Sequence, residues 1–147
     1  MSDDELRAFL DEQMIVSCAT TGPNGRPHLV PLWYVHDDGE LRGWTYAKSQ
    51  KARNLERDPR ATLQVEDGVQ YDELRGVMLE CDVEIEHEPE RVARYGLELF
   101  GRYASGGGEP APEVREMVEK QAPKRIGLRF VPTRVVSWDH GKLGGSY

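Results

Sequence analysis

Residues 45–59, TYAKSQKARNLERDP, combine basic side chains with a helix-start signal. The segment gathers four cations although the whole chain has a formal net charge of −7: Lys48, Lys51, Arg53 and Arg57. Ser49 stands where an N-cap would, and there a hydroxyl and free backbone N–H groups converge on one point. An anion at that point would gain from the helix dipole and from the ammonium groups together. The pattern fits two interpretations about equally, an anion-binding site and an ordinary solvated helix face.

Groups for acid–base, nucleophilic or metal chemistry are scarce in the rest of the sequence. No nucleophile has a recognisable base beside it, no pair of carboxylates stands out, and the histidines lack the spacing of metal ligands. We therefore predict no metal site and name no catalytic residue, although Tyr34, Tyr46 and water qualify as proton donors by type.

The composition favours one small soluble domain. The chain has 147 residues, of which 38% are hydrophobic and 31% are charged, which suits a protein with much surface or a core completed by a partner subunit. There is no apolar run of roughly 18 residues and no secretory leader pattern, so we expect no membrane span and a cytoplasmic location. Cys18 and Cys81 lie in apolar, strand-like runs and are expected to be buried, reduced thiols. The negative net charge argues against nucleic-acid binding.

Hydrophobic periodicity places these residues in a mainly β, α+β architecture. Ser2 and Glu5 form a capping-box pattern that begins an N-terminal helix, and Asp58-Pro59 ends the helix that starts at Ser49. The other predicted elements are helices at 89–104 and 113–121, and strands at 14–20, 28–35, 41–47, 61–67, 76–86, 125–131 and 134–140. Six or seven antiparallel strands in hairpin order, with peripheral helices, predict one domain over residues 1–147 that forms a closed or half-closed barrel.

Two prolines interrupt the predicted strands. Pro31 lies inside the strand at 28–35, and its missing N–H predicts a sheet edge or a bulge. Pro132, with the threonine after it, separates the last two predicted strands.

The register of the basic segment resembles that of the pyridoxamine 5'-phosphate oxidase family. In that family a Thr is followed at fixed offsets by Ser, Lys, Leu and Pro, which this chain matches at Thr45, Ser49, Lys51, Leu55 and Pro59. The order of elements around the segment is similar to the FMN-binding split β-barrel of the same superfamily. The resemblance covers nearly the whole chain, most closely residues 6–67, and it implies a split barrel of six to seven antiparallel strands.

The resemblance also implies a bound cofactor. Members of the superfamily bind FMN, heme or the deazaflavin coenzyme F420, typically as homodimers with the cofactor at the subunit interface. The oxidases proper hold the FMN phosphate with an Arg and a Lys at positions that Leu29 and Tyr34 occupy here, so that grip is missing. The chain is more similar to the deazaflavin reductase branch, whose cofactor carries a phosphodiester and a polyglutamate tail. This similarity favours coenzyme F420, with FMN as the alternative.

The implied site combines the basic segment with the apolar strand. The phosphate and tail are expected at Lys48, Ser49, Gln50, Lys51 and Asn54, the ring slot at Val30, Pro31, Leu32 and Trp33, and further cofactor contacts at Thr45, Tyr46 and Trp138. Trp138 belongs to a C-terminal stretch, residues 137–147, that is either a terminal strand with a mobile end or a lid or subunit-bridging arm over the cofactor. The implied function is hydride transfer from reduced F420 to an unidentified organic acceptor. The alternatives are an FMN-binding oxidoreductase, a non-catalytic cofactor carrier, and a structural dimer that kept the barrel and lost the ligand.

Overall fold

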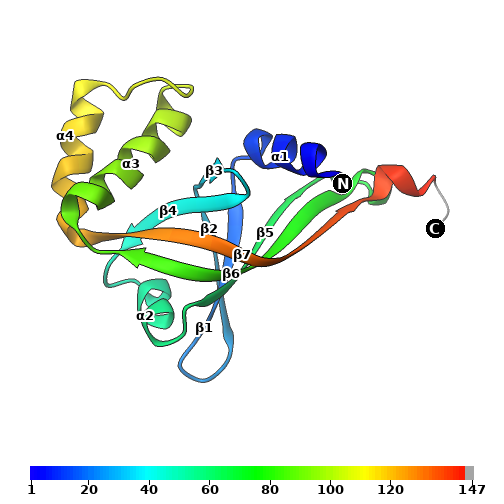
Figure 1. Ribbon diagram of the computed structural model, residues 1–147, viewed down its shortest axis with the longest axis horizontal. Helices are drawn as coiled ribbons and strands as arrows, with labels where there is room; N and C mark the ends of the chain where they lie inside the picture. The colour runs from blue at the N-terminus through cyan, green and yellow to red at the C-terminus, as the bar shows by residue number, and fades with distance from the viewer. Residues whose placement is uncertain (145–147) are drawn as a thin grey trace.

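Seven strands form one antiparallel sheet in the computed structural model, which describes residues 1–144. The strands are β1 (Val16–Thr21), β2 (Pro27–Leu32), β3 (Val35–Asp37), β4 (Glu40–Tyr46), β5 (Arg60–Asp67), β6 (Arg75–Glu86) and β7 (Arg125–Asp139). Their order across the sheet is β2-β1-β5-β6-β7-β4-β3, so the long β6–β7 pair lies near its middle (Figure 1).

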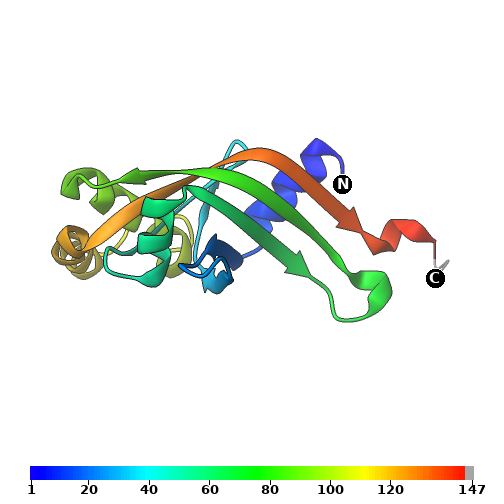
Figure 2. The same ribbon diagram turned by 90° about the horizontal axis from the view of Figure 1, so that it is seen from below.

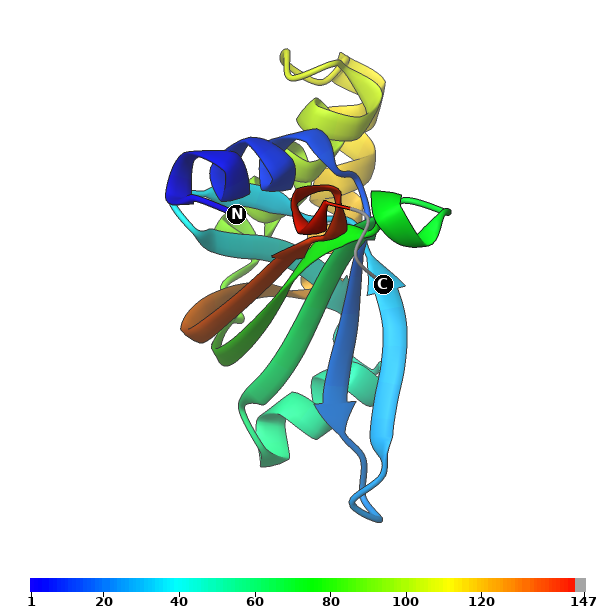
Figure 3. The ribbon, with the colours of Figure 1, turned by 90° about the vertical axis from the view of Figure 1, so that its right-hand side faces the viewer.

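The sheet is rolled into a half-barrel. β2 and β3 lie at its two opposite edges, yet only Trp33 and Tyr34 separate them in the chain, so the two edges must come close together. No ladder joins β2 to β3 among the described residues, and the barrel is therefore split on that side. Figure 3 shows the strands fanning around this curved surface. The predicted α+β split barrel is confirmed.

The prediction of one continuous strand at 28–35 is wrong. β2 ends at Leu32 and the chain crosses to the other edge of the sheet before β3 begins. The ladder stops because the Tyr34 N–H donates to the hydroxyl of Tyr103 at 3.0 Å instead of to a neighbouring strand. Pro31 lies on the edge strand β2, as its missing N–H required.

The prediction of two final strands is also wrong, since β7 runs without interruption from Arg125 to Asp139. Pro132 lies opposite Cys81, where the register between β6 and β7 shifts at a bulge. Among the described residues, β4 pairs with residues 125–130 of β7 and no strand lies on the other side of Pro132, so no neighbour there needs a donor from this position. The bulge lets the strand continue through the proline.

In the described part of the chain, four helices and three 3₁₀ turns flank the sheet: α1 (Asp3–Glu12), α2 (Gln50–Arg57), η1 (Tyr71–Glu73), α3 (Pro89–Ala104), α4 (Pro112–Gln121), η2 (Ala122–Lys124) and η3 (His140–Leu143). The predicted capping box of Ser2 and Glu5 is present at the start of α1. α3 and α4 lie side by side at one end of the molecule, and α2 lies near that end below the sheet (Figures 1 and 2). No helix within residues 1–144 is long and apolar enough to cross a membrane.

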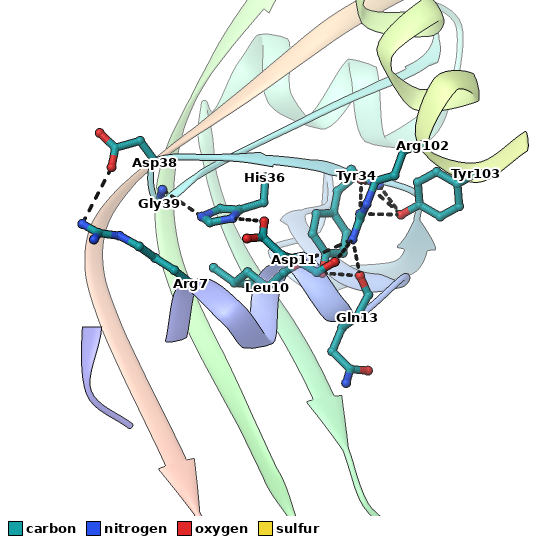
Figure 4. Close-up of polar contacts among 10 residues, drawn as sticks. All are labelled: Arg7, Leu10, Asp11, Gln13, Tyr34, His36, Asp38, Gly39, Arg102 and Tyr103. Carbon is teal, nitrogen blue, oxygen red and sulfur yellow. Dashed lines mark hydrogen bonds and ion pairs between the residues drawn. The ribbon is translucent and has the colours of Figure 1, made fainter. Parts of the chain in front are cut away.

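A guanidinium from α3 fastens α1 to the link between β2 and β3 (Figure 4). Arg102 donates to the carbonyl oxygens of Gln13 at 2.6 Å and Asp11 at 3.0 Å, and also to that of Tyr34. The Tyr34 hydroxyl lies 2.7 Å from the Leu10 carbonyl and 2.8 Å from that of Gln13. These bonds provide donors for carbonyl groups at the end of α1 that have no partner inside the helix. They also hold the link between β2 and β3 against α1 and α3.

The core lies inside the half-barrel. It is built from the inward-facing residues of the strands together with Phe9 and Leu10 of α1 and Leu55 of α2. Cys18 and Cys81 are both buried and free, as predicted.

Candidate functional site

The start of α2 offers free donors to a ligand. Ser49 is the N-cap, and its hydroxyl accepts the N–H of Ala52 at 3.1 Å and lies 3.4 Å from Oγ1 of Thr45. The N–H groups of Gln50 and Lys51 have no acceptor within residues 1–144, as is normal in the first turn of a helix. Thr45 is the penultimate residue of β4, so the strand and a three-residue turn fix where α2 begins.

Lys51 is a buried cation without a counterion within residues 1–144. Its side chain is only 6% exposed, on the inner side of α2 near Cys18, and burial lowers the pKa of its ammonium group. Burial raises the pKa of the Cys18 thiol to about 11, so the thiol is neutral at physiological pH and does not offset the charge. Among the described residues Lys51 forms no ion pair and no side-chain hydrogen bond. An uncompensated buried charge of this kind is a candidate for binding an anion.

Several cations elsewhere on the sheet are paired with carboxylates. Arg129 lies 2.7 Å from Glu40 and 2.8 Å from Glu84, and Arg75 lies 2.9 Å from Asp67. Lys48 and Arg53, in contrast, are exposed beside the start of α2, and within residues 1–144 neither has a carboxylate within ion-pair distance. α2 and the turn before it thus carry three cations that the described residues leave without a carboxylate: Lys48, Lys51 and Arg53.

The inner face of β2 is one strand away from Lys51, because β1 pairs with β2 and contacts α2. β2 pairs with β1 so that Val30 is opposite Cys18 and Leu32 is opposite Val16, which turns both apolar side chains toward the interior. Both are partly buried. Pro31 is exposed because its side chain alternates to the other face of the sheet. The structure thus brings two of the four predicted ring-slot residues to the inner face of the edge strand next to β1.

Asn54 is buried behind the helix start. Its amide donates to Oγ1 of Thr20 at 3.0 Å, and its oxygen accepts from Gln50 at 2.8 Å. Asn54 has no exposed surface, whereas Gln50 is exposed, so the asparagine ties α2 to β1 and orients the Gln50 side chain. Nearby on β2, Nδ1 of His28 is buried without a hydrogen-bond partner among the described residues.

Two of the predicted aromatic residues do not reach α2. Trp33 stacks on Tyr103 with ring centroids 4.3 Å apart and meets Phe100 edge-on, so it packs against α3. Trp138 lies over Gly76, near the far end of β6 and β7 from α2. Six residues of β5 separate that end of the sheet from α2, which is roughly 20 Å of strand. Tyr46 does adjoin the helix start, at the end of β4, and is 45% exposed.

Two residues that sequence reasoning missed also adjoin the helix start. The N–H of Ala47 donates to the carbonyl oxygen of Lys124 at 2.9 Å, and Arg125 pairs with Tyr46 across the β4–β7 ladder. Lys124 and Arg125 stand at the start of the predicted strand at 125–131, but the sequence does not indicate which strand pairs with it. Only the pairing of β4 with β7 brings this pair to the basic segment.

Comparison with known proteins identifies relatives of the whole chain. The family model described as pyridoxamine 5'-phosphate oxidase matches residues 2–139. The crystal structure of a conserved hypothetical protein from Mycobacterium tuberculosis is 45% identical, with a TM-score of 0.88, over 100% of this chain and 90% of that one. A structure described as an F420 reductase is 25% identical, with a TM-score of 0.67, over 88% of this chain and 94% of that one. The heme storage protein HutZ from Vibrio cholerae shares the fold at 16% identity, with a TM-score of 0.71, over 91% of this chain and 92% of that one. No curated protein matches the chain.

Proposed function

The chain belongs to the pyridoxamine 5'-phosphate oxidase family, and from that premise we propose that it binds the deazaflavin coenzyme F420 and acts as an F420-dependent reductase. The observation that carries this proposal is the unpaired positive charge at the start of α2. F420 bears a phosphodiester and several carboxylates, so it offers anions to Lys51 and to the exposed cations together. The relative described as an F420 reductase supports the same choice, because its likeness extends over most of both chains.

The residues at the helix start suit a phosphodiester. Ser49 and the free N–H groups of Gln50 and Lys51 are hydrogen-bond donors that converge on the positive end of α2. The Lys51 ammonium adds a charge that the described part of the protein leaves uncompensated. The hydroxyl of Thr45, at the end of β4, contacts the hydroxyl of Ser49. Asn54 is a positioning residue, because its oxygen accepts a hydrogen bond from the Gln50 side chain.

The remaining contacts follow from what each side chain exposes. Lys48 is assigned to the tail because it is exposed and unpaired within residues 1–144, while Val30 and Leu32 offer apolar surface to the ring. The bound reduced deazaflavin would supply the hydride for the acceptor. Tyr34 is not assigned as a proton donor, since its hydroxyl is buried against two carbonyls and its pKa is raised to about 12 by burial. Tyr46 is the exposed phenol next to the helix start.

We assign the active form to a homodimer. Several apolar side chains are exposed on the sheet, among them Leu29 and Val136, and a second copy would cover them. Trp138 lies too far along the β6–β7 pair to reach α2 of its own chain, so in this proposal it serves the site of the partner subunit.

Direct titration of the purified protein tests the proposal. Deazaflavin fluorescence is followed as F420 is added, and a parallel experiment uses FMN. We expect F420 to bind at least about tenfold more tightly than FMN. We also expect protein loaded with reduced F420 to catalyse its oxidation by an added enone or quinone. Tight FMN binding without F420 binding would overturn the choice of cofactor. F420 binding without turnover of any acceptor would indicate a carrier.

A further inference from the structure

His36 joins the N-terminal helix to the turn between β3 and β4 (Figure 4). Its side chain is only 5% exposed, on the face of β3 where its strand partner Leu41 is fully buried. Nδ1 of the ring lies 2.8 Å from the Asp11 carboxylate in the last turn of α1, and Nε2 lies 2.9 Å from the backbone nitrogen of Gly39. Both ring nitrogens are therefore in use, one toward the helix and one toward the turn.

These two contacts fix where the imidazole carries its hydrogen. A backbone N–H only donates, so Nε2 must present its lone pair to Gly39. An ionised carboxylate only accepts, so Nδ1 carries the hydrogen that points to Asp11. The ring in this arrangement is neutral, with its single hydrogen on Nδ1.

A second proton on this ring has to enter at Nε2. The new N–H would face the N–H of Gly39, and two donors do not form a hydrogen bond with each other. The bond to the turn must therefore break, while the contact with Asp11 becomes an ion pair between opposite charges. Proton uptake thus strengthens one end of the connection and releases the other.

The charged groups around the ring favour the positive form. Three carboxylates and one guanidinium face it: Asp3, Arg7 and Asp11 from α1, and Asp38 from the turn. β6 and β7 line the same small cavity with Leu79 and Val135, which carry no charge. Arg102 of α3 approaches Asp11 from another side and donates to its backbone carbonyl at 3.0 Å. Carboxylates thus outnumber guanidinium groups, and the N–H of Gly39 is the group that opposes protonation.

Charges on the other face of the β3–β4 hairpin pair with one another. Arg42 lies 3.0 Å from Asp37 and 3.0 Å from Glu98 of α3. Because successive residues of a strand alternate between faces, Asp37 points away from the side that His36 occupies. This cluster holds the body of the hairpin whatever the state of the imidazole.

The turn itself keeps its shape without the bond to the ring. Asp38 and Gly39 have positive φ angles of 47° and 85°, and Asp-Gly is a residue pair that such two-residue hairpin turns favour. Arg7 lies 3.8 Å from Asp38, but both side chains are largely exposed, so this ion pair contributes little. Loss of the Gly39 bond therefore frees the tip of the hairpin from α1 without unfolding it.

We propose that His36 is a pH-sensitive connection between α1 and the β3–β4 turn. The neutral ring ties the turn to the end of the helix, and the protonated ring releases the turn and keeps its contact with Asp11. The change is local, because the strand pairs of β3 and β4 and the Arg42 cluster remain in place. It does not depend on which cofactor the protein binds.

NMR spectra of the parent protein test this connection directly. Long-range ¹H–¹⁵N correlation spectra of the imidazole show which ring nitrogen carries hydrogen, and amide exchange at Gly39 reports the bond to the turn. Both are followed as the pH is lowered from about 8 to 5, the interval in which histidine ordinarily gains its charge. Gly25 is the internal control: it also has a positive φ, 79°, in a hairpin turn, but its N–H donates to the backbone carbonyl of Gly22.

We expect hydrogen on Nδ1 alone at the upper end of this interval and on both ring nitrogens at the lower end. The protection of the Gly39 amide, corrected for the ordinary effect of pH on exchange, should fall by about 3- to 10-fold, the range for the loss of one hydrogen bond. The protection of Gly25 should not change.

Two variants separate the imidazole from other titrating groups. His36→Gln keeps a side-chain acceptor for the Gly39 N–H and cannot gain a proton, so the protection of Gly39 should no longer depend on pH. His87→Gln is the matched control at an exposed histidine and should behave like the parent. Thermal unfolding of each variant shows whether the fold is intact.

Several results would overturn the inference. Hydrogen on Nε2 of the neutral ring would refute the assigned arrangement. A ring that gains its charge while Gly39 stays protected, or a ring that stays neutral throughout, would refute the release of the turn. A loss of Gly39 protection that persists in His36→Gln would show that another group senses the pH.

Discussion

Lys51→Met removes a buried ammonium group, and we expect it to act in opposite directions on stability and on binding. Lys51 is 6% exposed and has no counterion among the described residues, so the folded apoprotein bears a desolvation cost without a compensating ion pair. Methionine keeps an unbranched stem in the same space and removes the charge. The apoprotein should therefore become more stable, while an anionic ligand should bind less tightly.

The expected magnitudes follow from the burial of this one group. A buried polar group without a partner costs about 1–3 kcal/mol, and we take the lower end because Nζ is not among the fully enclosed unpartnered atoms of residues 1–144. A gain of about 1 kcal/mol should raise the melting temperature by roughly 3 °C for a chain of this size. Loss of a charge-assisted contact to a phosphate, about 1.5–3 kcal/mol, should weaken F420 binding roughly 10- to 150-fold.

The pH dependence supplies an independent check on the same group. Burial lowers the pKa of Lys51 below its unfolded value, so the cost is fully present below the folded pKa. It is relieved as the pH rises from the folded pKa to the unfolded value of roughly 10.4, because the folded state then binds fewer protons than the unfolded state. The stability advantage of the methionine variant should therefore shrink as the pH rises from the folded pKa of Lys51 toward its unfolded pKa.

Urea unfolding of the apoprotein and fluorescence titration with F420 measure the two effects separately. Lys48→Met is the control for stability, since Lys48 is exposed and its replacement should leave the free energy of unfolding within about 0.5 kcal/mol. A Lys51→Met protein that is clearly less stable than its parent would show that the apoprotein already satisfies the ammonium. A variant with unchanged F420 affinity would refute the phosphate role of Lys51.

Three further changes test the parts of the fold that support the site. Asn54→Ala should lower the free energy of unfolding by about 1–3 kcal/mol in urea titrations, because it leaves the buried Thr20 hydroxyl without its donor. Tyr34→Phe should cost about 1–2 kcal/mol and speed amide exchange at the end of α1, where the hydroxyl bonds two carbonyls. The Lys142 ammonium lowers the Glu5 carboxyl pKa to about 2, so this pair should stabilise the fold at neutral pH and cease to do so as the pH falls from about 4 toward 2. Lys142→Ala should return the Glu5 pKa toward its usual range in an NMR titration, and an unmoved pKa would contradict the assignment.

Local signals made the helices predictable. The side chains of Ser2 and Ser49 each accept a hydrogen bond from a backbone N–H in the first turn of the helix that they cap. Asp58-Pro59 ends α2 because the proline restricts the backbone of the residue before it. These features do not depend on the rest of the fold, and the structure has all of them. The alternating pattern of β6 was equally readable, since one face of that strand packs on the core.

The two strand errors came from contacts between distant residues. Whether a proline ends a strand depends on which neighbour faces its missing N–H, and this is settled by sheet order. Pro31 lies on an edge strand and Pro132 lies at a bulge beyond the reach of β4, so both strands continue through their prolines. The break came instead at Tyr34, whose N–H bonds to a hydroxyl on α3, about seventy residues away in the chain.

The same distinction applies to the candidate site. Spacing placed Ser49 and Lys51 on one helix start, and Ala52 and Leu55 mark the inward face of α2, but residue type does not show that Lys51 and Asn54 are buried beside them. Packing on β1 buries Lys51 together with Asn54, and neither burial is readable from residue type because both residues are usually exposed. The position of Lys124 next to the turn before α2 could not be predicted from the sequence, because it depends on the pairing of β4 with β7.

The pairing of charges elsewhere on the sheet explains how an acidic chain can attract an anion at one place. Strand and helix neighbours bring acids to bases on the face that α3 flanks, where Arg42 contacts Asp37 and Glu98, and Arg129 contacts Glu40. Those cations are neutralised locally and add little to the field beyond about a Debye length. Residues 45–55 contain no carboxylate at all, so the positive charge of α2 is not cancelled by its own segment. With a net charge of −7, the chain as a whole repels anions. At the start of α2 the local charge is positive, so an anion is attracted there.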